Sequence, residues 1–371
     1  MAKIGLVTFS KSPDNYGQVL QALATQEYLK ARGHRIYFLR EHVCWHRRFV
    51  SRFKFQVKRM LFSLIGYERF KTINNDWLKT SLCEIMENTD EKRHPRHIEQ
   101  FRKKYFDILY NSKKNLRKLN LDVLCTGSDQ IWTCASKHYF LRFGSPQTKR
   151  IAIAPSTGNR ELSADDKKII ATWLPSYSFI TTREASGVKL CESLGYKDAI
   201  QILDPTFLLT ANSYQQFASS QTTHRHYLFV YLLQAETCVT YDSIKLFANN
   251  NNLEIKYVTG GRRYEECEQI YATVQDWLAL MRDAQYVITN SFHGMAFSVI
   301  FRKPFLVLPL TGTTSKTNER IDNIASEFGL TDRIFKGDFS ILFKDIDYNI
   351  ASKKVKENKK ILENLMTEAG L

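Results

Sequence analysis

The sequence lacks the long hydrophobic run that a membrane-spanning helix needs. Its densest apolar stretch, Tyr227 to Leu233, covers seven residues, against the ~18 that a spanning helix requires. The N-terminus lacks the charged start, long apolar core and cleavage site of a secretory signal. The seven cysteines form no C-x-x-C pair, so a disulfide framework or structural zinc site is poorly supported. These absences exclude an integral membrane protein and favour a cytoplasmic one.

Several nucleotide-binding and nucleic-acid-binding motifs are also missing. No G-x-G-x-x-G follows the first predicted strand and no Walker loop occurs, which removes the main support for NAD-dependent and ATP-dependent chemistry. Zinc fingers, RNP-like aromatic strands and basic-region heptads are absent as well, so we expect no nucleic-acid partner. What the chain has is positive charge: 53 Lys and Arg against 38 Asp and Glu, a net charge of +15. Such an excess favours anionic partners, either phosphorylated small molecules or anionic lipid surfaces.

The order of predicted elements indicates two domains. At roughly 150 residues per domain, the 371 residues suggest two. Strands and helices alternate in two successive runs, which predicts an N-terminal Rossmann-like domain at 1–205 and a C-terminal one at 206–371. The first carries a basic helical insertion at 41–115, and the second ends in a helix at 352–369. Strands are expected at 3–10, 35–39, 121–125, 150–154, 179–182, 199–203, 227–233, 254–259, 286–289 and 305–308.

The predicted fold class is therefore α/β, with two doubly wound Rossmann-like domains that face a central cleft. Ligands of such sheets bind at the carboxyl ends of the strands, so two facing sheets place the ligand between them. This is the architecture of a GT-B-type enzyme.

The most informative segment is 288–305, where a strand ends and a helix begins. Asn290 or Ser291 can cap this helix, and its free amides and dipole can bind an anion. His293 lies in the first turn and can exchange protons near neutral pH. Gly294 allows a ligand or the backbone to approach closely. The alternative is a capped helix with a structural histidine.

Three cationic residues are placed to hold an anion. Arg183 follows the strand at 179–182, where a guanidinium can grip a carboxylate or phosphate through two hydrogen bonds. Lys316 and Arg320 lie just before or within the start of a later helix. The alternatives are a surface salt bridge for Arg183 and a solvated helix face for the other two.

Two loops of the first domain suit a sugar. Asp129 and Trp132 follow the strand at 121–125 and offer a hydroxyl acceptor and a flat apolar ring. Asn15, Tyr16, Gly17 and Gln18 follow the first strand by the same logic. Both loops should open on the same edge of the sheet, so we expect the acceptor there. A turn aspartate and a core tryptophan are the alternative.

Residues 44–70 combine an apolar stripe with basic residues. Phe49, Phe53, Val57, Met60, Leu61 and Leu64 recur at spacings of three and four. Arginines and lysines lie around or opposite this face, as an interfacial helix requires. The expectation is peripheral association with an anionic membrane, at its inner face. The alternative is an insertion that packs on the first domain.

Six sequence blocks in order resemble the polysaccharide pyruvyl transferase family. Together they span most of the chain apart from 41–115 and the last helix. The blocks are NYGQVLQALA (15–24), GSDQIW (127–132), TREAS (182–186), DPTFLL (204–209), TNSFHGMAFSVIFRKPF (289–305) and NERI (318–321).

The resemblance implies a GT-B-like fold and transfer of pyruvate from phosphoenolpyruvate to a sugar of a cell-surface polysaccharide precursor, with a cyclic ketal formed and phosphate released. It implies no cofactor or metal, and an acceptor that is a glycan or lipid-linked glycan. His293 matches the family's histidine and becomes the general acid, and Arg183 becomes the residue that holds the donor's anionic groups. Some members have Arg-Leu-His where this chain has Ser291, Phe292 and His293, so Arg320 or the helix amides take over the missing arginine's contacts.

Two other functions share these sequence features. A GT-B glycosyltransferase with a sugar-nucleotide donor would have the same fold. A non-catalytic, membrane-associated scaffold of glycan assembly would bind neither donor.

Overall fold

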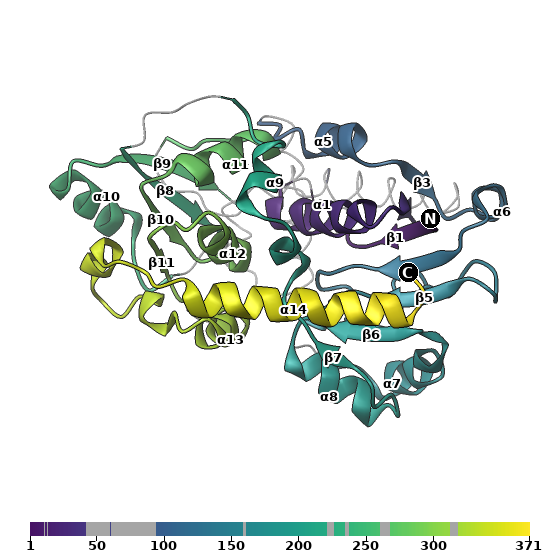
Figure 1. The fold of residues 1–371 in the computed structure, drawn as a ribbon. Coiled ribbons are helices and arrows are strands. Elements are labelled where there is room, and N and C mark those ends of the chain that lie inside the picture. Colours follow the sequence, from purple (N-terminus) through teal and green to yellow (C-terminus); the bar gives the residue numbers. More distant parts are fainter. Residues whose placement is uncertain are drawn as a thin grey trace.

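The computed structural model describes residues 1–10, 12, 14–41, 60, 94–158, 161–220, 226–233, 237–259, 268–311 and 318–371. Within them the chain forms two parallel sheets that lie side by side (Figure 1). The first has seven strands in the order β3-β2-β1-β4-β5-β6-β7. Their bounds are β1 Lys3–Val7, β2 Arg35–Arg40, β3 Ile108–Tyr110, β4 Val123–Thr126, β5 Lys149–Ala152, β6 Phe179–Thr182 and β7 Ile200–Gln201.

Strand residues alternate between two apolar layers on the faces of this sheet. Ile36 and Phe38 of β2 belong to the layer that includes helix α1. Tyr37 and Leu39 belong to the opposite layer. Because successive strand side chains point to opposite faces, both faces of a parallel sheet must be covered. The helices that follow these strands are α1 Tyr16–Ala31, α5 Ile98–Tyr105, α6 Lys113–Leu119, α7 Ala164–Ala171 and α8 Ala185–Ser193.

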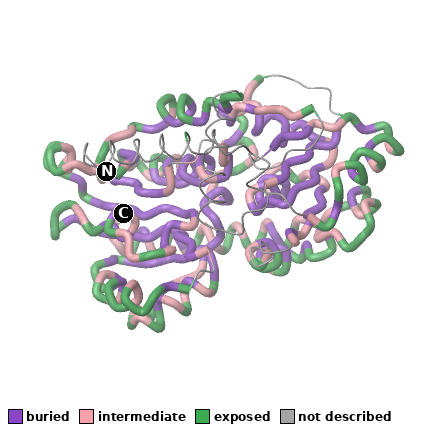
Figure 2. Tube along the Cα trace, turned by 180° about the vertical axis from the view of Figure 1, so that it is seen from behind, coloured by how far each residue is buried: buried purple, intermediate pink, exposed green. Residues whose placement is uncertain are grey.

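The second sheet has four strands in the order β11-β10-β8-β9. They are β8 Tyr227–Leu232, β9 Glu254–Thr259, β10 Tyr286–Thr289 and β11 Phe305–Val307, all in parallel pairs. β8 is buried along its whole length, as expected for a strand covered on both faces, and Figure 2 shows buried strands inside exposed helices. Its helices are α9 Ala211–Gln215, α10 Tyr241–Asn250, α11 Val274–Asp283, α12 Phe292–Ile300, α13 Glu319–Glu327 and α14 Asn349–Glu368.

One continuous core joins the two sheets. Tyr16, at the start of α1, is fully buried and stacks on Trp277 of α11 with ring centroids 5.5 Å apart. Its hydroxyl donates a hydrogen bond to the carbonyl of Ala272 at 2.6 Å. Tyr231 of β8 meets the same ring edge-on. The N-terminus of α1 is thereby fixed against the second sheet, where aromatic stacking and a satisfied hydroxyl both stabilise the junction.

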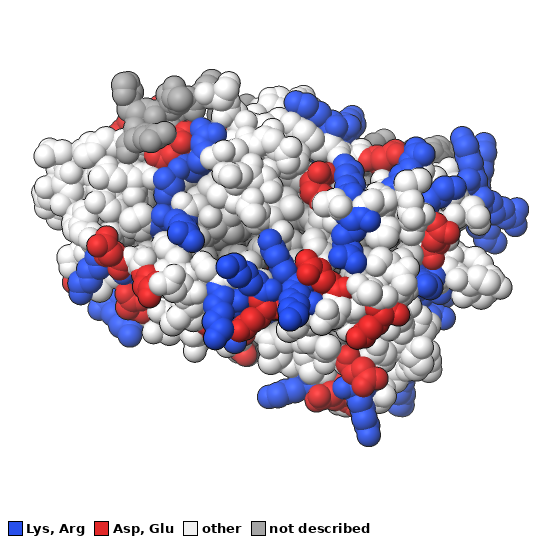
Figure 3. All heavy atoms as spheres, viewed as in Figure 1, with Lys and Arg blue, Asp and Glu red and all other residues white. Residues whose placement is uncertain are grey.

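Helix α14 connects the last part of the chain back to the first sheet (Figure 1). Asn358 accepts a hydrogen bond from the amide of Leu203 at 2.9 Å. Near the helix end, Lys149 donates to the carbonyl of Ala369 and Arg32 to that of Leu371. Basic side chains lie over α14 in Figure 3, with acidic ones among them. The exposed lysines of this helix include Lys353, Lys354, Lys356 and Lys360.

The predicted fold class is confirmed: the protein is α/β, of GT-B type, with parallel sheets of seven and four strands. The expectation of a purely helical insertion at 41–115 is wrong at its end, because Ile108–Tyr110 forms β3 beside β2. The expected interfacial helix at 44–70 lies outside the described residues except for Met60. Among the described helices, none is both long and apolar enough to cross a membrane.

Candidate active site

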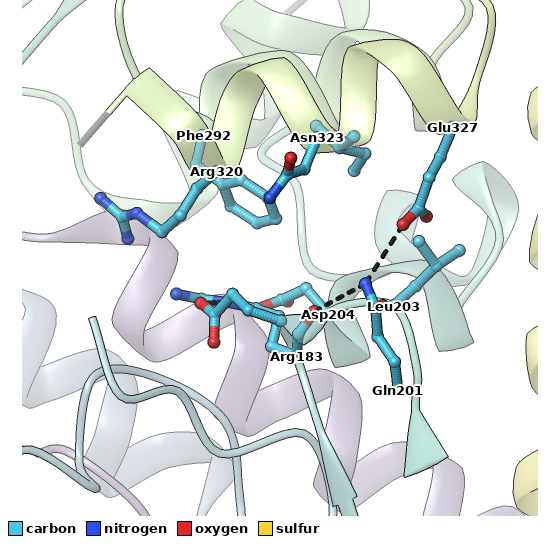
Figure 4. Close-up of a pocket in the computed structure, with 10 residues that line it drawn as sticks. Arg183, Gln201, Leu203, Asp204, Phe292, Arg320, Asn323 and Glu327 are labelled. Carbon is cyan, nitrogen blue, oxygen red and sulfur yellow. Dashed lines mark hydrogen bonds and ion pairs between the residues drawn. The ribbon is translucent and has the colours of Figure 1, made fainter. Parts of the chain in front are cut away.

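A cavity lies where the two sheets meet, between the ends of β6 and β7 and the starts of α12 and α13 (Figure 4). Gln201 of β7 fixes one end of it. Its amide nitrogen donates to the carbonyl of Arg183 at 3.5 Å and to the carboxylate of Glu327 in α13 at 3.1 Å. Both domains therefore supply its walls. The lining residues are Arg183, Glu184, Gln201, Leu203, Asp204, Phe292, Arg320, Asn323, Ile324 and Glu327.

Asp204 is the centre of the polar network in this cavity. Its Oδ2 atom accepts hydrogen bonds from Ser128 at 3.0 Å and from Arg183 at 3.2 Å. Its Oδ1 atom accepts from both the amide and the hydroxyl of Thr206. Burial alone would raise the pKa of this carboxyl, but His293, Arg183 and the Thr206 amide together hold the pKa well below its usual range. Asp204 is therefore an ionised, fully buried carboxylate.

His293 faces this carboxylate from the second domain. Ser291 caps α12 by accepting from the amide of Gly294, and this places His293 in the first helical turn. The Nε2 atom of His293 lies 3.8 Å from Oδ2 of Asp204 and has no hydrogen-bond partner among the described residues. Gly17 of α1 packs on the ring so closely that a Cβ there would lie 2.0 Å from Nδ1. The ring is thus held between the two domains with one nitrogen available.

Arg183 is fully engaged within the protein. Its three guanidinium nitrogens contact Glu184 at 3.0 Å, Asp204 at 3.2 Å and the hydroxyl of Ser156 at 3.0 Å. Phe292 covers the guanidinium, with the ring centroid 5.0 Å away. Despite burial, the two carboxylates raise the pKa of Arg183. The residue expected to grip the donor is instead the cation that holds two carboxylates together, and its role in donor binding stays a prediction.

Arg320 is the cation that remains available. It points into the cavity from α13, opposite Arg183 (Figure 4), and forms no hydrogen bond or ion pair with any other described residue. Burial and the charge of Arg183 lower its pKa to about 10, while Glu184, Asp129 and Asp204 act in the other direction. It is therefore charged at neutral pH and faces a site whose other cation is already paired. An anionic ligand would relieve the repulsion between the two arginines.

The remaining residues at the start of α12 support the structure. The side-chain amide of Asn290 pairs with the backbone of Leu233 at the end of β8. Ser291 is buried and donates its amide to the hydroxyl of Thr289. A Cβ on Gly294 would lie 2.1 Å from that hydroxyl, so the glycine accommodates Thr289 and not a ligand. These three residues position His293 and do not face the cavity as donor-binding groups.

The loop after β1 has a similar role. Asn15 caps α1 by accepting from the amide of Gln18 at 3.1 Å. Tyr16 lies in the core between the sheets and Gly17 lies against His293, as described above. Tyr16 therefore offers no surface to an acceptor sugar, because its ring and its hydroxyl are both occupied. Acceptor binding by Asn15 and Gln18 stays a prediction.

Asp129 and Trp132, which were expected to bind the acceptor together, have different surroundings in the structure. Trp132 is 1% exposed and stacks on Phe140 with centroids 4.6 Å apart, so its ring offers no face to a sugar. Asp129 has a φ of +86°, in the left-handed region that non-glycine residues rarely adopt. Its Oδ1 atom accepts from the amide of Gln130 at 2.7 Å, while its buried Oδ2 atom has no partner among the described residues.

Sequence reasoning missed the acidic half of the site. Asp204 and Glu184 stand inside two of the quoted blocks, DPTFLL and TREAS, but only the arginine of the second was singled out. The hydroxyls of Ser128 and Ser156 that contact these carboxylates were also missed. The signal was available, because Asp204 directly follows the predicted strand at 199–203 and Glu184 comes two residues after the one at 179–182.

Two further expectations concern Lys316 and metals. Lys316 lies outside the described residues, so its role stays a prediction. Within the part of the chain that the structure describes, no three His, Cys, Asp or Glu side chains are grouped so that they could hold a metal ion.

The comparison with protein families identifies the chain. Two parallel sheets that meet at a cavity with a buried carboxylate and a free arginine, with a histidine beside the carboxylate, define an enzyme-like site of GT-B architecture. The model of the polysaccharide pyruvyl transferase family matches residues 15–311. The chain belongs to this family.

Solved structures with a similar arrangement are distant. They include UDP-N-acetylglucosamine 2-epimerase from Rickettsia bellii, with 10% identity, 97% of this chain and 88% of that chain covered and a TM-score of 0.43. A putative epimerase of the same kind from Listeria monocytogenes has 11% identity, coverages of 99% and 89% and a TM-score of 0.45. Arabidopsis thaliana UGT89C1, complexed with UDP-L-rhamnose, has 10% identity, coverages of 100% and 92% and a TM-score of 0.40. No curated protein matches the chain.

Proposed function

We propose that this protein transfers pyruvate from phosphoenolpyruvate to a sugar of a polysaccharide precursor and releases phosphate, with a cyclic ketal as the product. The observation that carries the proposal is the pair formed by His293 and the ionised Asp204, because Asp204 lines one cavity with the unpaired Arg320. The reaction needs a proton donor and a cationic site for the donor's carboxylate and phosphate. His293, beside Asp204, offers the first, and Arg320 in the cavity wall offers the second.

His293 is the proton donor in this scheme. Protonation of C3 of the enol converts it to a methyl group and leaves cationic character at C2, where a sugar hydroxyl attacks. Asp204 keeps a negative charge beside the imidazolium before transfer, and its saturated hydrogen bonds fix its position. The distance of 3.8 Å is longer than a hydrogen bond, and catalytic contacts often shorten only when substrate is bound.

Arg320 binds the anionic end of phosphoenolpyruvate, with Arg183 behind it. A guanidinium can make two parallel hydrogen bonds to a carboxylate or phosphate. Phe292 and Ile324 are the apolar part of the wall, where they lower the local dielectric and strengthen these contacts. Arg320 thus takes the place of the arginine that some family members carry at the position of Ser291.

Ligand-induced stabilisation tests the donor. The melting temperature should rise with phosphoenolpyruvate, because a ligand that binds only the folded state stabilises it. Phosphate release is then measured with a panel of methyl hexosides and glycan precursors, and the product is identified by mass spectrometry. Stabilisation by UDP-hexoses without any effect of phosphoenolpyruvate would instead support a sugar-nucleotide glycosyltransferase.

A further inference from the structure

Glu184 carries a carboxylate oxygen that the protein itself does not use. The residue is 5% exposed, and it lines the cavity at the start of α8. Its Oε1 atom accepts from Nε of Arg183 at 3.0 Å and from the hydroxyl of Ser156 at 2.6 Å. Its Oε2 atom is buried and has no hydrogen-bond partner among the described residues. A buried acceptor without a partner is costly, so this atom indicates a ligand that donates a hydrogen bond.

The other carboxylates of the site differ from Glu184. Each oxygen of Asp204 already accepts two hydrogen bonds from protein groups, and Oδ2 also faces His293, so this carboxylate is committed to the protein. Glu327 lies at the far end of the cavity and accepts from Gln201. Asp129 also has a free Oδ2 atom, but it does not line the cavity wall. Among the carboxylates of the cavity wall, Glu184 therefore differs in that protein groups hold its Oε1 atom while its Oε2 atom can accept a hydrogen bond from a ligand.

We propose that Glu184 is the general base that takes the proton of the attacking acceptor hydroxyl. This inference rests on the proposed pyruvyl transfer and adds a catalytic residue to it. The hydroxyl proton passes to Oε2 of Glu184 while the hydroxyl oxygen forms a bond to C2 of phosphoenolpyruvate. The electron pair of the C2–C3 double bond takes a proton from His293 at C3. The adduct keeps the phosphate. When the second hydroxyl attacks C2, the phosphate leaves with the C2–O electron pair and takes the proton of that hydroxyl, so that it departs as hydrogen phosphate.

Arg183 explains how a base and an acid can coexist in so small a space. The guanidinium contacts Glu184 on one side and Asp204, the partner of His293, on the other. It separates the two negative charges and holds each carboxylate in a fixed direction. Because Oε1 of Glu184 is held by hydrogen bonds, Oε2 has a single orientation. A general base must be oriented toward the proton that it takes. This is a second reason why Arg183 is occupied by protein groups.

The variant Glu184→Gln tests the proposal. Glutamine keeps the length of the side chain and an oxygen for Arg183, but places an NH₂ group where the free oxygen was. We expect turnover to fall by ~10²–10⁴, the usual contribution of a general base, while the affinity for phosphoenolpyruvate, measured by calorimetry, stays the same. Glu192→Gln removes the same charge from the exposed end of α8 and is the matched control.

The kinetic and binding measurements on the Glu184 variants can overturn the proposal in several ways. Wild-type turnover in Glu184→Gln overturns the proposal, and so does a loss confined to phosphoenolpyruvate affinity, which would make Glu184 a structural partner of Arg183. If Glu184→Gln does not fold, Glu184→Asp keeps the charge beside Arg183 but withdraws the carboxylate. It should lower kcat at least tenfold, and an unchanged kcat overturns the proposal. If the wild-type protein releases no phosphate with any acceptor, the proposed function fails and this inference fails with it.

Discussion

The Nε2 atom of His293 lies 3.8 Å from the Oδ2 atom of Asp204, although Asp204 follows β7 of the first sheet and His293 begins α12, which follows β10 of the second. The contact crosses the junction between the sheets, close to the place where Gly17 abuts the imidazole ring. Each domain thus holds half of the proposed proton-transfer pair. The packing of the two domains, and not one local motif, creates the candidate site.

Replacement of His293 by Ala should remove the proton donor. We expect turnover to fall by ~10²–10⁴, because no other described side chain faces Asp204 with an exchangeable proton of similar acidity. Binding of phosphoenolpyruvate should persist, since Arg320 is untouched. Steady-state kinetics together with calorimetry separate the two effects. Near wild-type turnover in a folded variant would remove His293 from the mechanism.

Asp204→Asn should change how stability depends on pH. The folded-state pKa of Asp204 is depressed below its ordinary value of 3.8, because His293, Arg183 and the Thr206 amide stabilise the charged form. Its stabilising contribution is therefore fully present above the unfolded-state pKa and is lost as the pH falls through the folded-state pKa. The variant should be less stable at neutral pH by ~3–5 kcal/mol, because a buried ion network loses one partner.

The wild-type protein should accordingly lose more of its stability below about pH 4 than the variant does. Urea unfolding at several pH values measures the difference. Parallel curves for the two proteins across the acid range would show that Asp204 is not ionised in the folded state.

Strand and helix alternation predicted most of the fold correctly. The limits of β6, β9 and β10 agree with the predicted ranges, because buried strands and amphipathic helices have distinct periods. β3 was missed because it has only three residues, half-exposed and preceded by a basic helix. A short edge strand carries too little apolar pattern to be distinguished from the helices around it.

The candidate site was predictable only in part. His293 and Arg320 follow from their places at helix starts. Tyr16 and Trp132 were assigned to the acceptor because an aromatic residue after a strand looks the same whether its ring faces the cleft or the core. The partnership of Asp204 with His293 has no local signature, because it joins positions 89 residues apart. Only the packing of the two domains determines it.

Arg320→Gln should weaken phosphoenolpyruvate binding. A hydrogen bond to a charged group contributes ~1.5–3 kcal/mol, so we expect the dissociation constant to rise about 10-fold to 100-fold. The melting temperature without ligand should hold, because Arg320 has no ion pair with the other described residues to lose. Lys336→Gln, at an exposed position of the same domain, serves as the control for net charge. An unchanged dissociation constant would mean that the anion binds elsewhere.

Gly17→Ala tests whether the first domain positions the histidine. A Cβ at this position would lie 2.0 Å from Nδ1 and 2.3 Å from Cγ of His293, so the ring must move. Alanine otherwise favours the helix by about 0.5–1 kcal/mol over glycine. The free energy of unfolding should therefore change little. We therefore expect a fall in kcat of at least tenfold, since an error of about 1 Å in a catalytic group can cost ~10²-fold. The double variant with His293→Ala isolates the cause: alanine at position 17 should have no further effect once the imidazole is absent. A full additional loss in the double variant would show that Gly17 acts on the substrate or on the domain junction and not through His293.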